Sequence, residues 1–292
     1  MGDVRLTDLS YLRALMARYG IVTKKKYGQN FLVNPSVPER IAEHGCDARC
    51  GVLEIGPGVG TLTYELCKRA RKVVALEIDE TLLPVLRETL GEFDNVKVIL
   101  RDVLKTDLVK LCEEEFSGCE SVRVCANLPY YITTPVLMYL LENGAPFSSV
   151  TVMVQREVAD RLTARAGSPE YGAITAAVGY FGRAEKLFSV SPGSFLPPPK
   201  VESAVVRIDI HENSPYADCD KELFFRLIGA AFGQRRKTLM NTLRGILSEK
   251  EREAVMNELS LLGFPRDVRG ERLSTDGFAA LARAIAAARK NA

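Results

Sequence analysis

Residues 124–131, VCANLPYY, combine the pattern of a buried strand with a polar turn that could handle a planar, amine-bearing molecule. The apolar residues are typical of an interior strand, which a proline cannot continue because it lacks a backbone donor. The amide oxygen of Asn127 and a nearby backbone carbonyl could accept both hydrogens of an exocyclic amine. Tyr130 could stack on the ring that carries this amine, while Pro129 keeps the turn rigid. We therefore predict a catalytic turn formed by Asn127, Leu128, Pro129 and Tyr130.

A glycine-rich turn and three acidic residues could hold a ligand with an adenosine part. The glycines of LEIGPGVG, residues 53–60, let the backbone turn tightly and approach a ligand, but they do not have the G-x-G-x-x-G spacing of dinucleotide sites. Glu54 precedes them, which favours an amine-bearing ligand over a pyrophosphate. Glu77 and Asp102 follow the next two strands, where they could accept from ribose hydroxyls and from an adenine amino group. This pattern predicts S-adenosylmethionine and fits NAD less well.

The expected chemistry follows from these two groups of residues. An aromatic exocyclic amine is a poor nucleophile because its lone pair is delocalised into the ring. Two acceptors that pull on its hydrogens favour a pyramidal nitrogen, and no strong base is needed because the proton becomes acidic as a methyl group arrives. We therefore expect catalysis by positioning and electrostatic stabilisation, on a base taken out of its stack.

These side chains need a sheet whose strands end at one common edge. Strands and helices alternate from residue 51 onward, which predicts a mostly parallel, doubly wound sheet of the Rossmann type. The expected strands are residues 51–56, 72–79, 96–100, 122–127 and 150–155. The expected helices are residues 7–19, 61–70, 80–91, 106–116 and 156–165, with a further helix capped by Thr134 and carrying Pro135 at its first position.

The alternation stops in the last third of the chain. Residues 184–192 and 202–210 have strand patterns, and the segment between them is too short for a crossover helix, which predicts an antiparallel hairpin at the sheet edge. A polar linker at 211–220 then leads to helices near 221–232, 234–247, 249–262 and 274–289. We therefore predict an α/β domain over residues 1–212 and a small all-α domain over residues 213–292.

Positive charge is concentrated at both ends of the chain. Residues 223–292 contain 13 Lys and Arg against 7 Asp and Glu, and residues 5–26 contain six basic residues and one acid. A solvated helix face explains many such runs, but two basic regions favour a polyanionic partner. Three cations at the start of the expected helix 234–247 oppose its macrodipole, which favours phosphate contact. The candidate residues for binding this polyanion are Lys24, Lys25, Lys26, Arg235, Arg236, Lys237 and Arg244.

The remaining composition argues against several other classes of protein. Seven cysteines without framework spacing and two histidines favour reduced, packed thiols and no metal site. No apolar run approaches the ~20 residues that a membrane span needs. The N-terminus lacks a signal-peptide pattern, so we expect a cytoplasmic protein without membrane association. We also expect a monomer.

Five motifs together resemble the rRNA adenine dimethylase family, and within it the bacterial small-subunit rRNA adenine-N6,N6-dimethyltransferases. They are KKYGQNFL (25–32), EIGPGVG (54–60), NLPYYITTP (127–135), SFLPPPKVESAVVR (194–207) and AFGQRRKTLMNTL (231–243). The resemblance runs from about residue 5 to residue 285, nearly the whole chain. The motif with QRRK is more particular to the small-subunit enzymes than to the dimethylases of large-subunit RNA.

The resemblance implies a class I methyltransferase that uses S-adenosylmethionine. Its implied reaction is N6,N6-dimethylation of two adjacent adenines in the 3′-terminal hairpin of small-subunit (16S) rRNA, with the small ribosomal subunit as partner. Asn127 would hold the target amine, and Tyr130 and Phe195 would stack on the flipped base. Tyr131 stands where many members have Asn, but Asn127 and Tyr130 are intact. The implied cofactor residues are Gln29, Asn30, Leu32, Glu54, Gly56, Gly58, Glu77, Asp102, Val103 and Asn127.

Other classes of function remain open at this point. Protein glutamine and DNA adenine methyltransferases can share an Asn-x-Pro-Tyr site, but the basic ends and the QRRKTLMNTL segment speak against them. A large-subunit rRNA adenine dimethylase is a closer alternative. A non-catalytic ribosome assembly factor could have kept the fold alone, although intact Glu77, Asp102 and Asn127 argue against loss of activity.

Overall fold

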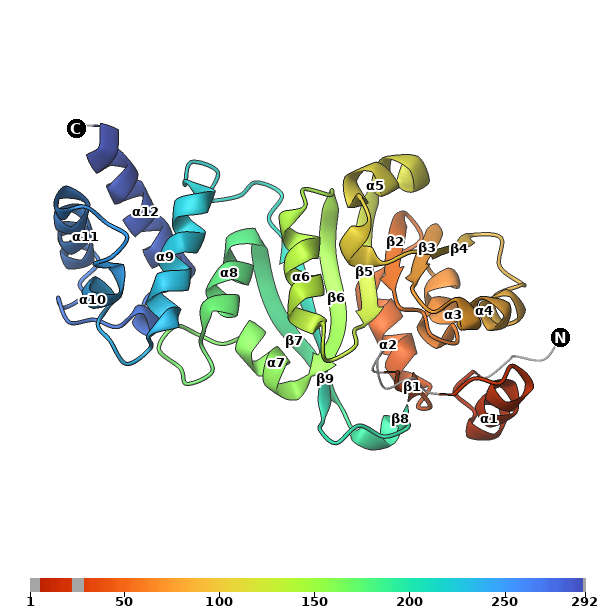
Figure 1. Ribbon diagram of the computed structural model, residues 1–292. Helices are drawn as coiled ribbons and strands as arrows, with labels where there is room; N and C mark the ends of the chain where they lie inside the picture. The colour runs from red at the N-terminus through yellow and green to blue at the C-terminus, as the bar shows by residue number, and fades with distance from the viewer. Residues whose placement is uncertain (1–5, 23–28, 291–292) are drawn as a thin grey trace. The chain divides into compact units, whose positions relative to one another are not determined.

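The computed structural model describes residues 6–22 and 29–290, and the chain divides into two compact units (Figure 1). The first unit contains the chain up to Ala159 and Glu185–Ile210, and the second contains Asp160–Ala184 and the residues from His211 onward. This division differs from the boundary expected at residue 212. The reason is that α8 (Ala173–Phe181) buries its apolar side chains in the core of the helical unit.

A seven-stranded sheet in the order β4-β3-β2-β5-β6-β9-β7 organises the first unit. The strands from β2 to β6 pair in parallel, and β9 runs antiparallel to β6. This confirms the predicted α/β, mostly parallel, Rossmann-like sheet. The strands are β2 (Cys50–Ile55), β3 (Lys72–Glu77), β4 (Val96–Leu100), β5 (Ser121–Asn127), β6 (Phe147–Gln155), β7 (Gly182–Val190) and β9 (Ser203–Ile210).

Helices cover the central strands of this sheet. Every residue of β2 is buried, as expected for a parallel strand with both faces covered. Ile41 of α2 and Leu66 of α3 belong to one apolar cluster with Val52 of β2 and Met153 of β6. The first helices of the chain are α1 (Leu9–Arg18), α2 (Ser36–Gly45), α3 (Thr61–Cys67), α4 (Leu83–Thr89), α5 (Leu108–Phe116), α6 (Thr133–Glu142) and α7 (Arg156–Leu162).

The turn between β2 and α3 depends on its glycines. Gly56, Gly58 and Gly60 have φ values of 69°, 61° and 90°, in the left-handed region that residues with a Cβ rarely adopt. The Gly56 amide donates to the carbonyl of Leu76 at 2.9 Å, which ties the turn to β3. A Cβ built on Gly56 would meet no atom within 4 Å. The turn is therefore tight, and it faces open space where a ligand could approach the backbone.

The start of α6 differs from the sequence prediction. The helix begins at Thr133, and its N-cap Ile132 makes no side-chain capping bond, so Thr134 is not the cap and Pro135 is not the first residue. The hydroxyl of Thr133 instead donates to the carbonyl of Pro129 at 3.1 Å. The first residue of the helix therefore stabilises the NLPY turn.

A small antiparallel sheet joins β1 (Phe31–Leu32) to β8 (Phe195–Leu196), and the sequence pattern did not indicate it. Leu32 pairs with Phe195 in this ladder. The Val33 amide donates to the Ser194 carbonyl at 2.8 Å and extends the connection. The segment before α2 is thereby held against the loop between β7 and β9.

The second unit is helical, as predicted. Its helices after α8 are α9 (Lys221–Gly233), α10 (Leu239–Leu243), α11 (Glu249–Leu261) and α12 (Thr275–Lys290). Phe224 and Phe278 are fully buried in its core. The segment 211–220 is not the simple polar linker that we expected, because Tyr216 is buried and stacks on the ring of Tyr180 with centroids 5.4 Å apart.

The helix predicted over residues 234–247 is wrong except at residues 239–243. Gly233 ends α9, and residues 234–238 form a turn before the five-residue helix α10. The Leu239 amide donates to the carbonyl of Val268 at 2.7 Å, and the Leu239 side chain is fully buried. Arg235, Arg236 and Lys237 therefore lie in a turn after the C-terminus of α9, where the helix macrodipole favours positive charge, so the predicted opposition to a macrodipole is wrong.

Candidate active site

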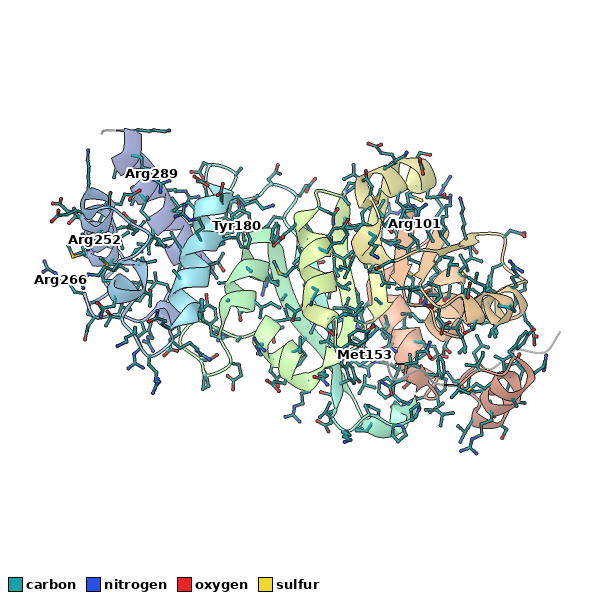
Figure 2. The ribbon with its side chains drawn as sticks, in the orientation of Figure 1. Arg101, Met153, Tyr180, Arg252, Arg266 and Arg289 are labelled. Carbon is teal, nitrogen blue, oxygen red and sulfur yellow. The ribbon has the colours of Figure 1, made fainter. Side chains whose placement is uncertain are left out.

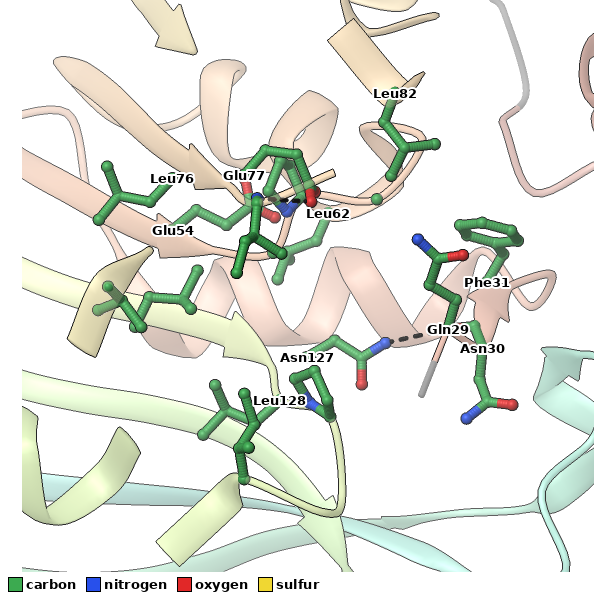
Figure 3. Close-up of a pocket in the computed structure, with 18 of the residues that line it drawn as sticks. Gln29, Asn30, Phe31, Glu54, Leu62, Leu76, Glu77, Leu82, Asn127 and Leu128 are labelled. Atoms are coloured by element: carbon green, nitrogen blue, oxygen red, sulfur yellow. Dashed lines mark hydrogen bonds between the residues drawn. The ribbon is translucent and has the colours of Figure 1, made fainter. Parts of the chain in front are cut away.

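One pocket gathers most of the residues that the sequence indicated. It lies in the first unit, where the carboxyl ends of β2, β3, β4 and β5 meet the segment around β1 (Figure 3). All predicted cofactor residues line it, together with four of the five predicted catalytic residues. These lining residues are Gln29, Asn30, Leu32, Glu54, Gly56, Gly58, Glu77, Asp102, Val103, Asn127, Leu128, Pro129 and Tyr130.

Glu54 is a buried carboxyl group at the base of this pocket. Its side chain is 1% exposed, and its Oε2 atom has no hydrogen-bond partner among the described residues. Burial, followed by the negative charge of Glu77, raises the pKa of Glu54 to about 8. A buried polar atom without a partner is costly, and a ligand that brings a donor would satisfy it. Glu54 therefore fits the amine-bearing end of a ligand.

Glu77 is held rigidly at the end of β3. Its Oε1 atom accepts from the amides of Ile78 and Asp79, both at 2.8 Å. Burial raises the pKa of Glu77, while these amides favour its charged form. Gln29 donates to the Oδ2 atom of Asp79 at 3.1 Å, so the segment before β1 is tied to the same strand end. This arrangement presents a fixed acceptor to the pocket.

Asp102 and two apolar residues form the part of the pocket that follows β4. The Oδ1 atom of Asp102 accepts from the Leu104 amide at 3.0 Å and caps the short 3₁₀ turn η3 (Val103–Lys105). Val103 lines the pocket next to this carboxylate, and so does Ile78, whose side chain the sequence analysis did not single out. Ile78 is 51% exposed, which is unusual for a large apolar side chain. An acceptor beside apolar surfaces suits a flat ring with an amino group.

Asn127 is oriented by a hydrogen bond from its own amide nitrogen. Its Nδ2 atom donates to the backbone carbonyl of Asn30 at 3.3 Å, and Figure 3 shows Asn127 reaching toward that segment. Its Oδ1 atom thus remains an acceptor. The Leu128 amide donates to the Met153 carbonyl at 3.2 Å, and the Ile132 amide donates to the Pro129 carbonyl at 3.2 Å. The NLPY turn is therefore fixed on both sides of Asn127.

The two predicted stacking rings differ in position. Tyr130 lines the pocket, and its hydroxyl shares a hydrogen bond of 2.6 Å with Ser203, a residue of the motif 194–207 to which the sequence gave no role. Phe195 does not line the pocket. Its ring is 3% exposed and packs in the apolar cluster that contains Leu32 and Ile41. Phe195 is thus paired with the pocket residue Leu32 but lies outside the pocket lining, and its stacking on a target base stays a prediction.

The predicted RNA-binding cations also separate into groups. Lys24, Lys25 and Lys26 lie outside the described residues. The Arg235 guanidinium donates to the carbonyl of Tyr171 at 3.1 Å and forms an ion pair with Glu271 at 3.4 Å, so it stabilises the helical unit. Among the predicted cations within the described part of the chain, Arg236, Lys237 and Arg244 are exposed and form no ion pair.

Further exposed cations lie near this turn, and the sequence analysis did not select them. The bond between Leu239 and Val268 brings the segment before α12 beside residues 234–238. This segment carries the exposed residues Arg266, Arg269 and Arg272. Figure 2 shows Arg266 at the periphery of the helical unit. Their distance along the chain from the QRRK motif explains why no local pattern selected them.

The remaining expectations concern thiols, metals and membranes. All seven cysteines are free, and only Cys119 is partly exposed. Within residues 6–22 and 29–290, no group of three His, Cys, Asp or Glu side chains is arranged to hold a metal ion. No helix in the same ranges combines the length and apolar content needed to cross a membrane.

Comparisons with known proteins identify the family of this chain. The model of the family described as ribosomal RNA adenine dimethylase matches residues 21–266. A ribosomal RNA small subunit methyltransferase A from Bacillus pumilus is 45% identical over 276 residues, which are 94% of each chain. The protein of that name from Alkaliphilus oremlandii is 42% identical over 284 residues, which are 97% of this chain and 98% of the relative.

Two solved structures share both units of the chain. A dimethyladenosine transferase from Plasmodium falciparum has a TM-score of 0.75 and 25% identity, covering 89% of this chain and 98% of its own. The 23S rRNA methyltransferase ErmE has a TM-score of 0.70 and 25% identity, covering 88% of this chain and all of its own, 100%. The resemblance inferred from the motifs is confirmed, and the chain belongs to the ribosomal RNA adenine dimethylase family, as an rRNA adenine dimethyltransferase.

Proposed function

We propose that this enzyme dimethylates N6 of two adjacent adenines in the 3′-terminal hairpin of 16S rRNA, with S-adenosylmethionine as methyl donor. The observation that carries the proposal is the fixed amide of Asn127, whose free oxygen lies in one pocket with three carboxylates. Similarity over nearly the full length to proteins named ribosomal RNA small subunit methyltransferase A favours the small subunit over the large one. The enzyme acts as a cytoplasmic monomer on the small ribosomal subunit.

The residues of the pocket fit the proposed cofactor. The unpartnered Oε2 atom of Glu54 and the open space in front of Gly56 are the two features that a ligand would complete. When bound, S-adenosylmethionine supplies an electrophilic methyl group. Glu54 would hold its amine end, Glu77 its ribose hydroxyls and Asp102 its adenine amino group. Gln29, Asn30 and Leu32 would cover it from the side of β1.

The NLPY turn would hold and activate the target amine. The Oδ1 atom of Asn127 accepts one amine hydrogen. The Pro129 carbonyl already accepts from Ile132 and Thr133, so the second acceptor is the carbonyl of Leu128. Positive charge would develop on the nitrogen as it accepts the methyl group and the bond of that group to the donor sulfur breaks, leaving a neutral thioether, and both acceptors would stabilise this charge. The proton then leaves to water, and Tyr130 keeps the ring in place by stacking.

The decisive test uses unmethylated small ribosomal subunits and a labelled methyl donor. The proposal requires two methyl groups on each of two adjacent adenines near the 3′ end, located by mapping the modified nucleotides. Large subunits, offered in parallel, should remain unlabelled. Label on large subunits alone would favour the large-subunit alternative. Tight subunit binding without any label would favour a non-catalytic assembly factor.

Cofactor affinity should rise with pH through the titration of Glu54. With a pKa raised to about 8, this carboxyl is largely protonated at neutral pH. Because an amine-bearing ligand binds the carboxylate form, the affinity should increase from about pH 6 and level off above about pH 8. Calorimetric titrations at several pH values measure this change. Glu54→Gln should lack this part of the pH dependence.

The same titration acts in the opposite direction on the stability of the free enzyme. Between the ordinary pKa of 4.5 and the raised value of about 8, the folded state binds more protons than the unfolded state. The free energy of unfolding should therefore fall as pH rises across this range. Glu54→Gln, which cannot titrate, should lose less stability over the same range. For cofactor binding, the contradicting result would be a ratio between the affinities of the wild-type enzyme and Glu54→Gln that stays constant at all pH values.

We further propose that Arg236, Lys237 and Arg244 contact RNA phosphates, together with Lys24, Lys25 and Lys26. The double variant Arg236→Glu, Lys237→Glu should bind small subunits more weakly. The slope of log affinity against log salt should flatten by about one unit for each lost contact. Cofactor affinity should stay unchanged, because the pocket lies in the other unit. Binding assays at several salt concentrations measure both effects.

Two control proteins make this experiment specific. Arg87→Glu with Arg226→Glu changes the net charge equally, at exposed cations that have no ion pair within the described residues. This control should keep most of the affinity and the salt slope. Arg235→Ala should lower the thermal stability, because Arg235 holds Tyr171 and Glu271. If the charge-matched control bound small subunits as weakly as the Arg236→Glu, Lys237→Glu variant, the turn would make no specific phosphate contacts and would contribute only to general electrostatic attraction.

A further inference from the structure

The hydroxyl groups of Tyr130 and Ser203 meet although the two residues are 73 positions apart. Their oxygens are 2.6 Å apart, and Ser203 is fully buried at the first position of β9. Tyr130 is the aromatic residue of the NLPY turn and lines the pocket. The contact thus links the pocket to the antiparallel part of the sheet.

The backbone around Tyr130 is already fixed, but this does not define the plane of its ring. Leu128 and Ile132 are hydrogen-bonded through their amides, and the Thr133 hydroxyl closes the turn on Pro129. Rotation about the two side-chain bonds of Tyr130 remains possible with the backbone held in this way. The phenol oxygen lies on the axis of the second rotation, so a bond to it fixes the direction of the ring axis. Because the O–H bond of a phenol lies in the plane of the ring, a hydrogen-bond partner on one side also favours one ring plane.

Ser203 is suited to be this second point because it lies on a rigid element. It pairs with Gln155 in the ladder between β6 and β9. The Arg156 amide donates to the Glu202 carbonyl at 2.9 Å, and the side chains of Arg156 and Glu202 form an ion pair at 2.6 Å. The position of the Ser203 hydroxyl is therefore set by the sheet, independently of the turn.

We propose that Ser203 is a positioning residue for methyl transfer, whose hydroxyl holds the ring of Tyr130 in the plane that stacks on the target adenine. This inference rests on the proposed function. The stacked ring keeps the amine of the base opposite Asn127, so a tilted ring lowers the fraction of bound bases that are ready to react. Burial raises the pKa of Tyr130, so the phenol stays neutral and the hydrogen bond persists at neutral pH.

Ser149 provides a matched comparison on the neighbouring strand. It lies on β6, is 1% exposed, and its hydroxyl has no hydrogen-bond partner among the described residues. Ser149 and Ser203 are thus both buried serines of the same sheet, and only Ser203 contacts the pocket residue Tyr130. Replacing each by alanine removes one oxygen in a similar environment.

A double-mutant cycle tests the proposal. Single-turnover methylation of unmethylated small subunits is measured with saturating S-adenosylmethionine for Ser203→Ala, Tyr130→Phe and the double variant. Each single change should slow methyl transfer about three- to tenfold, as expected for one neutral hydrogen bond. The double variant should be no slower than the slower single variant, because both changes remove the same bond. Ser149→Ala should react at the wild-type rate.

The other measurements separate positioning from folding. Cofactor affinity, cofactor stoichiometry and the subunit concentration for half-maximal rate should be unchanged in Ser203→Ala. A wild-type rate in Ser203→Ala, with the wild-type enzyme active, would overturn the inference. So would rate losses that multiply in the double variant, or a loss that matches a fall in cofactor stoichiometry. Absence of methyl transfer by the wild-type enzyme would instead reject the proposed function itself.

Discussion

Asn127→Ala will lower the single-turnover rate of methyl transfer by at least about 100-fold, as expected when an acceptor that acts mainly in the transition state is lost. The Oδ1 atom of Asn127 is the side-chain acceptor available to the amine, because the Nδ2 atom is bound to the carbonyl of Asn30. Binding of the small subunit should hardly change, since one base contributes little beside many phosphate contacts. The measurement is a single turnover at saturating cofactor, with subunit affinity determined separately.

Asn143→Ala is the matched control for this variant. Asn143 also uses its amide for backbone contacts, donating to the Leu140 carbonyl at 3.1 Å and accepting from the Ala145 amide at 2.8 Å. It follows the last residue of α6 and does not line the pocket. Its replacement should cost stability and leave the rate per folded molecule unchanged. A near-normal single-turnover rate in Asn127→Ala would remove Asn127 from catalysis.

Glu77→Ala and Asp102→Ala should each weaken cofactor binding about 10- to 100-fold. Each carboxylate is expected to accept a charge-assisted hydrogen bond, which contributes about 1.5–3 kcal/mol. Glu77 also holds two backbone amides, so Glu77→Gln, which keeps an acceptor, separates the loss of charge from loosening of the turn. Calorimetry measures the affinities, and thermal unfolding checks that the variants are folded.

Asp107→Ala is the control for Asp102→Ala. Both aspartates cap short helical segments, and the Oδ1 atom of Asp107 accepts from the Lys110 amide at 3.0 Å. Loss of a cap lowers stability by about 1 kcal/mol in either variant. Only Asp102 lines the pocket, so only its replacement should change the affinity. Unchanged affinity in both Glu77→Ala and Asp102→Ala would show that the cofactor binds elsewhere.

Much of the site could be predicted from local sequence patterns. Strand and helix periodicity indicated the parallel sheet, and the carboxyl ends of parallel strands meet at one edge. Glu54, Glu77, Asp102 and Asn127 each lie at or near the end of a strand, so the alternation alone brought them together. Their catalytic and binding roles stay predictions until the variants are measured.

Local patterns failed where a distant contact decides the conformation. Residues 234–238 have the composition of a helix, but burial of Leu239 and its bond to Val268 turn the chain there. Phe195 has the aromatic character of a stacking residue, yet pairing between β1 and β8 buries it in the core. Sequence patterns indicate the conformational preferences of neighbouring residues. They do not indicate contacts with residues that are distant along the chain, such as Val268 or strand β1.

The sequence by itself determined the sheet, the pocket edge and the identity of the groups that meet there, because these depend on periodicity and on residue type at strand ends. Only the tertiary structure decided which of these groups is free to act. It bound one end of the Asn127 amide to Asn30, joined Tyr130 to Ser203 and bound the Arg235 guanidinium to the carbonyl of Tyr171. Each of these contacts joins residues more than 60 positions apart, so it exists only once the chain has folded.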